Sequence, residues 1–218
     1  MLKDRLNEVE ERIERAAARA GRRRDEVTLV AITKVFPAAA ILEAWELGLR
    51  DFGENYIQEF ETKHPEVAGL QGARFHFVGH LQSNKARRAA ELFDVIQTVD
   101  TAKLARRLDE CGKPLDVMIE VRLSDENAKS GADPQVIPEL IEAISALRNL
   151  RVTGLMTMPP WSEDAEQSRP YFKRLRSLAE QYKLPHLSMG MSNDFEVAIE
   201  EGATHVRVGT ALFGSRKY

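Results

Sequence analysis

The chain has 218 residues, of which 43% are hydrophobic and 30% are charged. That is the composition of one ordinary globular domain, or of two very small ones. The 31 Lys and Arg residues against 34 Asp and Glu residues give a net charge of −3, which disfavours nucleic-acid binding because that needs a basic surface.

The cysteine content and the first residues bear on the compartment. Cys111 is the only cysteine, and one thiol can form neither an internal disulfide nor a zinc cage. A lone thiol is usual in a reduced compartment, so we expect a cytoplasmic protein. The first twenty residues carry five acidic side chains, unlike a signal or transit peptide, and no stretch approaches the roughly 18 apolar residues of a membrane helix. We therefore expect neither a targeting segment nor contact with a membrane.

The chain begins with a predicted helix over residues 2–20, where apolar residues recur at three- and four-residue spacing. Residues 27–34 (VTLVAITK) follow as a short β-branched apolar run, which is typical of a strand buried on both faces in a parallel sheet. Pro37 then stands at a favoured first position of a second helix, and Gly48 stands where that helix stops.

The same alternation of strand and helix continues to the end of the chain. The further predicted strands are short apolar runs at 49–53, 74–79, 93–99, 115–123, 151–158, 186–191 and 204–209. The further predicted helices lie at 55–64, 83–92, 101–110, 134–148, around 171–182 and at 194–201, with a terminal turn or helix at 210–216.

Eight strands that alternate with helices predict an α/β fold of the (β/α)8 TIM-barrel type, because parallel strands need crossover helices and eight of them close into a ring. The length fits, since such barrels start at about 200 residues. We predict a single domain over residues 1–218, with residues 1–24 as an extra N-terminal helix and connector. An open doubly wound sheet is the alternative, although no Gly-rich dinucleotide fingerprint follows the first strand.

Active sites of such barrels lie where the strands end and the following loops begin, so the candidate functional residues are those at the strand ends. These residues are Lys34, Gly53, Glu54, Asn55, Gly79, His80, Ser192, Asn193, Arg207, Gly209 and Thr210.

Lys34 ends an apolar strand, so its side chain starts in a region of low dielectric constant. Desolvation disfavours the ammonium form, and a neutral lysine amine can form a Schiff base with an aldehyde. A lysine that simply extends from the strand end into solvent is the alternative interpretation.

The stretch RVGTALFG, residues 207–214, runs from a strand into Gly209 and Thr210 just before a terminal helical turn. Glycine lets an oxyanion approach the backbone, N–H groups at a helix start donate to it, and the Thr hydroxyl adds a donor. Ser192, in the turn after the preceding strand, adds a second hydroxyl. Taken singly, Ser192 is an ordinary helix cap and Gly209 a tight turn, but at adjacent strand ends they favour a phosphate site.

An amine that can form an imine and a phosphate cradle on one barrel rim fit two kinds of ligand. One is pyridoxal 5′-phosphate, and the other is a phosphorylated sugar aldehyde. The residues taken one by one leave both open.

Seven ordered stretches make up the most specific pattern of the chain. They are AITK (31–34), FGENY (52–56), HFVGHLQSNK (76–85), SDENAKSG (124–131), GLMTM (154–158), LSMGMSND (187–194) and VRVGTALFG (206–214). From about residue 27 to its end, the chain thereby resembles the YggS/PLPBP family of pyridoxal phosphate homeostasis proteins. The resemblance implies a fold like the barrel domain of alanine racemase without its second domain.

The resemblance also implies pyridoxal 5′-phosphate as the cofactor and a role for six residues. Lys34 matches the lysine that holds the cofactor as an internal aldimine, Asn55 matches an asparagine near the ring, and Arg207 matches an arginine that faces the pyridine nitrogen. Three residues match phosphate binders, and these are Ser192, Gly209 and Thr210. We expect no catalytic residue and no metal site.

Three functions compete for such a site. A carrier would buffer the cofactor and deliver it to apo-enzymes that depend on it, and this is the function we expect, in a monomeric protein. A racemase would need an acid and a base on opposite faces of the bound amino acid. It is also disfavoured because Arg207, with an expected pKa above about 12, would leave the pyridine nitrogen unprotonated and so weaken the ring as an electron acceptor. An aldolase-like enzyme would form its Schiff base with a phosphorylated sugar instead.

Overall fold

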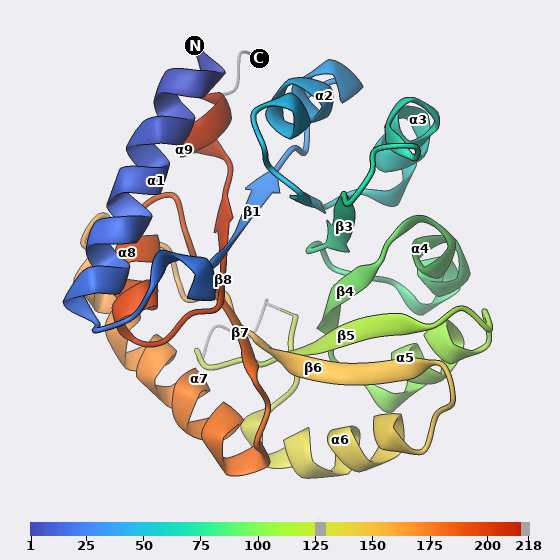
Figure 1. Cartoon of the computed structure of the whole chain (residues 1–218). Coiled ribbons are helices and arrows are strands. Elements are labelled where there is room, and N and C mark those ends of the chain that lie inside the picture. The colour runs from blue at the N-terminus through green and yellow to red at the C-terminus, as the bar shows by residue number, and fades with distance from the viewer. Residues whose placement is uncertain (125–129, 215–218) are drawn as a thin grey trace.

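The computed structural model describes residues 1–124 and 130–214 and shows eight parallel strands that close into a barrel (Figure 1). Each strand pairs with the next in sequence, and the last pairs with the first. The strands are β1 (Thr28–Ile32), β2 (Asp51–Glu54), β3 (Arg74–Phe77), β4 (Val95–Val99), β5 (Leu115–Glu120), β6 (Leu150–Met156), β7 (His186–Met191) and β8 (His205–Val208). The predicted (β/α)8 barrel is confirmed, and the open-sheet alternative is wrong because β1 and β8 pair.

Helices follow the strands and form the outer ring of the barrel (Figure 1). The α-helices are α1 (Leu2–Arg19), α2 (Ala38–Glu46), α3 (Ile57–Val67), α4 (Ala86–Leu92), α5 (Ala102–Asp109), α6 (Ile137–Ser145), α7 (Arg169–Tyr182), α8 (Phe195–Glu200) and α9 (Thr210–Phe213). The 3-10 helices are η1 (Arg24–Glu26), η2 (Ser83–Lys85), η3 (Pro134–Val136) and η4 (Ala165–Ser168). The helices predicted at 83–92 and 134–148 thus begin as 3-10 turns, and the second ends three residues early.

The N-terminal helix α1 covers the side of the barrel formed by α8 and α9 (Figure 1). Its apolar stripe is buried there, including Leu6, Val9 and Ile13. Beyond its end, the Arg22 guanidinium donates to the carbonyl oxygens of Ile199 and Ala203 at 3.0 and 2.8 Å. Ile199 lies in the last turn of α8, where a cation complements the dipole of that helix, so the connector ties α1 to the barrel.

Side chains of β1 alternate between two buried layers. Leu29 and Ala31 belong to the large core between the strands and the helices. Val30 and Ile32 instead form a small cluster with Val78 inside the barrel. The barrel interior near the carboxyl ends of β1 and β3 is therefore apolar, and the loops that follow these strands rest on it.

Two parts of the predictions lie outside the described residues. These are residues 125–129, inside the SDENAKSG stretch, and residues 215–216, the end of the predicted terminal helix. Over the residues that are described, none of the helices combines the length and the apolar character that crossing a membrane requires.

Candidate functional site

The carboxyl ends of four neighbouring strands, β7, β8, β1 and β2, surround a cavity of about 670 Å³. All six residues that the sequence singled out line this cavity, namely Lys34, Asn55, Ser192, Arg207, Gly209 and Thr210. Residues that are up to 176 positions apart in the chain (34 to 210) thus meet at one end of the barrel. The closed sheet explains this, because it brings the last strand beside the first.

Lys34 and Asn55 form one side of the cavity. Lys34 lies two residues beyond the end of β1 and is half-buried, and Asn55 follows β2 directly. Below them, Ile32 and Val78 make an apolar floor. Gly79 passes so close to Asn55 that a Cβ atom would lie 2.2 Å from the Asn55 carbonyl oxygen, so this position requires glycine.

Another part of the cavity lining holds a group of hydrogen-bonding residues at the start of α9. The Ser192 hydroxyl accepts the backbone N–H groups of Gly209 and Ala211, each at 3.3 Å. The exposed Thr210 stands between these two residues. The hydroxyls of Ser192 and Thr210 and the backbone N–H groups at a helix start are of the kind that bind phosphate oxygens.

Asp194 fixes the turn that presents Ser192. Its Oδ1 accepts the N–H of Met191 at 2.7 Å, and its Oδ2 accepts the Ser168 hydroxyl at 2.8 Å. Gly190 precedes this turn at a φ of +91°, and a Cβ atom there would lie 2.5 Å from the Cβ of Ala198. The sequence SMGMSND therefore builds a turn in which the serine hydroxyl is held in place.

Arg207 also lines the cavity and is only 4% exposed. Its Nη1 donates to the Ser188 hydroxyl at 2.7 Å, and its Nη2 donates to the carbonyl oxygen of Thr157 at 2.9 Å. Over residues 1–124 and 130–214, its guanidinium makes no ion pair.

Burial lowers the pKa of Arg207 to about 10, while the carboxylates of Asp194 and Glu120 act in the opposite direction. The shift is downward from the usual arginine value because the barrel interior desolvates the guanidinium. The group nevertheless remains a cation at neutral pH and donates hydrogen bonds only.

The segment after β6 forms a further wall that the sequence reasoning missed. Met158, Pro160, Trp161 and Ser162 line the cavity from this side. The Asn193 amide donates to the carbonyl oxygen of Ser162 at 2.8 Å and so ties this wall to the turn after β7. The motif GLMTM ends at Met158, and the irregular residues after it carry no periodic signal.

A second cavity of about 690 Å³ adjoins the first and shares Met158, Trp161 and Met191 with it. His80 lines this second cavity, as does the buried Glu120 at the end of β5. Burial raises the pKa of Glu120, and its Oε2 has no hydrogen-bond partner among the residues described. No group of three or more His, Cys, Asp or Glu residues in that same part of the chain could hold a metal ion.

Comparison with known sequences finds relatives that match this chain over nearly its whole length. The family model for the alanine racemase N-terminal domain matches residues 5–217. A pyridoxal phosphate homeostasis protein of Pseudomonas aeruginosa is 47% identical over 98% of this chain and 95% of its own length. The protein of the same name from Aquifex aeolicus is 44% identical over 99% and 98%.

Solved structures show the same architecture. The structure of PipY from Synechococcus elongatus with PLP bound has a TM-score of 0.84 and 37% sequence identity, and the match covers 98% of this chain and all of PipY. The alanine racemase of Corynebacterium glutamicum has a TM-score of 0.70 at 19% identity, with 97% of this chain and 61% of the racemase covered. This second match shows a shared fold only.

Proposed function

The chain belongs to the alanine racemase N-terminal domain family, and from that premise we propose that it binds pyridoxal 5′-phosphate as a homeostasis protein. The proposal includes a Schiff base between Lys34 and the cofactor aldehyde. Relatives that cover nearly the whole chain carry this name, and PipY has been solved with PLP bound. The observation that carries the proposal is the convergence of an amine, a phosphate cradle and a buried arginine in one cavity.

The cavity offers a complementary group for each part of the cofactor. Ser192, Gly209 and Thr210 would bind the phosphate, for which their hydroxyl and N–H groups are suited. Lys34 faces the same cavity and would bond the aldehyde carbon. Asn55 would contact the ring above the apolar floor. These contacts together suit a ligand that has a phosphate, an aldehyde and a flat ring.

Arg207 favours retention of the cofactor over catalysis on it. Bound PLP can accept electrons from a substrate carbanion, most strongly when its pyridine nitrogen is protonated. The Arg207 guanidinium is cationic at neutral pH, so it can donate a hydrogen bond to that nitrogen but does not readily supply a proton. We therefore propose a carrier or regulator, with a racemase as the alternative function.

The remaining expectations belong to the same proposal. We propose that residues 1–218 work as one cofactor-binding domain, with 1–24 as its N-terminal helix and connector, and that the protein is a monomer. PLP-dependent apo-enzymes would be its protein partners and receive the cofactor. The cytoplasm fits this task, because Cys111 is a free thiol and such recipients work in a reduced compartment.

An absorption spectrum of the purified protein after incubation with PLP tests this function. We expect an imine band that disappears on borohydride reduction, with the reduced adduct mapped to Lys34 by peptide mass spectrometry. A protein that shows no such band and instead forms a reducible adduct with a phosphorylated sugar would be an aldolase-like enzyme. Racemase assays with several amino acids then separate a carrier from the alternative enzyme.

A further inference from the structure

Lys34 sits in an unusual turn. The carbonyl oxygen of Thr33 accepts the N–H of Phe36 at 3.1 Å, which closes a β-turn with Lys34 and Val35 at its centre. Val35 has a φ of +64°, in the left-handed region. A β-branched residue is strained in this region, and such a position normally takes glycine. Contacts from outside the turn must therefore hold this conformation.

Three side chains from β2 and α3 form hydrogen bonds with Thr33 and Val35, the two neighbours of Lys34. The N–H of Val35 donates to Oε1 of Glu59 at 2.6 Å. The Thr33 carbonyl oxygen accepts Nζ of Lys63 at 2.9 Å, and the Thr33 hydroxyl donates to Oε1 of Glu54 at 2.7 Å. The residue before Lys34 and the residue after it are thus both fixed by hydrogen bonds to charged groups.

The same three side chains bond to each other behind the strands. Lys63 Nζ lies 2.8 Å from Glu54 Oε1 and 2.5 Å from Glu59 Oε1. With the Thr33 carbonyl, these two oxygens use all three N–H donors of the ammonium group. The side chains of Glu54 and Lys63 are 0% and 6% exposed, and that of Glu59 is 25% exposed.

A buried ion pair is weak evidence for stability, because desolvation offsets much of the attraction. Here the burial also leaves Glu54 Oε2 without a hydrogen bond in the described part of the chain. These ion pairs therefore gain little stability, but they do fix the turn that carries Lys34. Their position is better explained by this orientation of Lys34 than by stability.

We propose that Glu54, Glu59 and Lys63 form a positioning triad, which holds the Lys34 turn so that its amine meets the cofactor aldehyde. The inference rests on the proposed function of Lys34. In the reaction that it serves, the lysine nitrogen bonds the aldehyde carbon, the carbonyl oxygen leaves as water, and the nitrogen gives up its protons to complete that water. A preorganised amine accelerates this step because the reacting atoms start close together.

The triad acts through the backbone. The described lining of the cavity does not include Glu54, Glu59 or Lys63. They lie on the helix side of the strands, where α3 packs on the barrel. Their removal should therefore slow Schiff-base formation without weakening the binding of the phosphate.

Glu59→Ala tests the triad, and Glu61→Ala is its matched control. Both carboxylates lie on α3 and bind a cation, but Glu61 pairs with Arg88 on the solvent side. The measured quantity is the initial rate of the imine absorbance with pyridoxal, after subtraction of the Lys34→Ala background. We expect Glu59→Ala to lower this rate about tenfold, as the loss of one charge-assisted hydrogen bond predicts. Glu61→Ala should change it less than twofold.

Two further measurements separate positioning from general damage. Glu59→Gln keeps an acceptor for the Val35 N–H and should recover most of the rate. 4′-Deoxypyridoxine 5′-phosphate, which has the phosphate but no aldehyde, should bind Glu59→Ala and the parent with equal affinity.

Each outcome decides a different point. Equal rates for Glu59→Ala and Glu61→Ala would overturn the triad. It would also be overturned if Glu59→Ala bound the aldehyde-free ligand about tenfold more weakly than the parent, because that would show a general structural role. A parent protein that forms no Lys34 adduct with PLP would overturn the proposed function instead.

Discussion

The two ends of the barrel are both polar, but their charges are satisfied differently. At the amino-terminal ends of the strands, Asp116 accepts from Arg74 at 3.0 Å and from Arg151 at 2.8 Å. His76 lies 2.8 Å from Asp51. Apart from Asp51, these residues border a cavity of about 260 Å³. Charged groups at this end are bonded to one another within the protein.

At the carboxyl-terminal end, Glu54, Glu59 and Lys63 pair with one another outside the cavity, whereas the buried Arg207 lines it. The cavity there is about 670 Å³, and Arg207 has no carboxylate partner within the described residues. Because a buried cation without a counter-ion is unfavourable, such a group is retained where a ligand completes it. The difference fits the proposal that the amino-terminal end stabilises the barrel and the carboxyl-terminal end binds the ligand, which is the division found in other barrels of this type.

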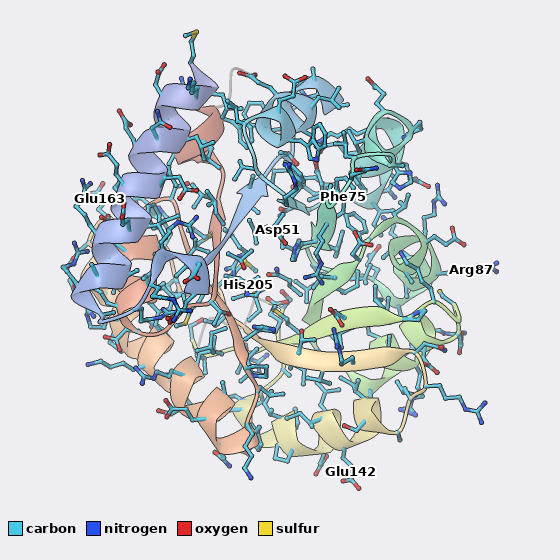
Figure 2. All side chains as sticks on the ribbon, viewed as in Figure 1. Asp51, Phe75, Arg87, Glu142, Glu163 and His205 are labelled. Atoms are coloured by element: carbon cyan, nitrogen blue, oxygen red, sulfur yellow. The ribbon has the colours of Figure 1, made fainter. Side chains whose placement is uncertain are left out.

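A hydrogen-bonded chain connects the two ends through the interior. Arg207 donates to Ser188, whose hydroxyl donates to Gln97 Oε1 at 2.6 Å. The Gln97 amide lies 3.0 Å from Nδ1 of His76, and Nε2 of His76 reaches Asp51. Asp51 and His205 are both labelled within the ring of strands in Figure 2. Hydrogen bonds therefore link the Arg207 guanidinium to side chains at the opposite end of the barrel.

Lys34→Ala should produce the largest effect, a complete loss of the borohydride-reducible adduct with PLP. The carboxyl-terminal cavity would keep its phosphate cradle, so noncovalent binding should persist with lower affinity. Lys85→Ala, in η2 and outside this cavity's described lining, is the control and should retain full stoichiometry. A normal imine band in the Lys34 variant would show that the covalent residue lies elsewhere.

The amino-terminal end should instead respond to acid. Burial, together with the neighbouring His76 and His186, lowers the pKa of His205 to about 3, while Asp51 opposes this shift. The unfolded chain binds this proton near pH 6.5, so the stability contributed by neutral His205 is complete above pH 6.5 and is lost as the pH falls toward 3. Between pH 7 and 5 the loss should be about 2 kcal/mol.

Urea denaturation of His205→Gln at both pH values measures this loss. The variant should lose about 2 kcal/mol less than the parent between pH 7 and 5. His80→Gln, at the exposed rim of the other end, should follow the parent. Identical pH dependence in the His205 variant and the parent would place the acid sensitivity in other groups.

Ser192→Ala and Thr210→Ala should have a smaller effect, confined to the carboxyl-terminal end. Each removes one hydroxyl donor to a charged phosphate, which typically contributes about 1.5 to 3 kcal/mol, so the affinity for PLP should fall about tenfold or more. Thr153→Ala is the matched control, because that hydroxyl lies at the amino-terminal cavity. Pyridoxal without phosphate should bind all three variants like the parent. Equal losses for both ligands would show that the hydroxyls serve the fold.

Much of this comparison could be predicted from the sequence, because it depends on local patterns. Short β-branched runs predicted the strands, and the barrel topology then predicted that residues at their ends would meet. The roles of Lys34, Asn55, Ser192, Arg207, Gly209 and Thr210 stay predictions, although the fold explains why they share one cavity.

The contacts that support the site could not be predicted, because they depend on the packing of distant segments. Ser188 and Gln97 lie in strands that resemble ordinary buried strands, and nothing local indicates that the two side chains meet. Glu59 and Lys63 have the spacing of a surface ion pair on a helix, so their burial against the Lys34 turn becomes visible only in three dimensions. Trp161 lies in an irregular segment without periodicity.

The smallest expected effect concerns catalysis. Arg207→Glu would let the pyridine nitrogen hold a proton, which strengthens the ring as an electron acceptor. Racemisation also needs an acid and a base on opposite faces of the bound amino acid. Of the described residues that line the cavity, the titratable ones are Lys34, Asp194 and Arg207, and both oxygens of Asp194 are engaged in hydrogen bonds.

We therefore expect PLP to bind Arg207→Glu more weakly and racemisation to stay near background in both the variant and the parent. Exchange of the alanine α-hydrogen in deuterated water, followed by NMR, measures this, and Lys34→Ala provides the background. Faster exchange in Arg207→Glu alone would show that a competent acid and base are present and that the arginine suppresses them. Turnover by the parent at about 1 per second or more would make the protein a racemase, since that is an enzymatic rate. Background exchange in both would mean that the carboxyl-terminal end holds the cofactor without the second group that catalysis requires.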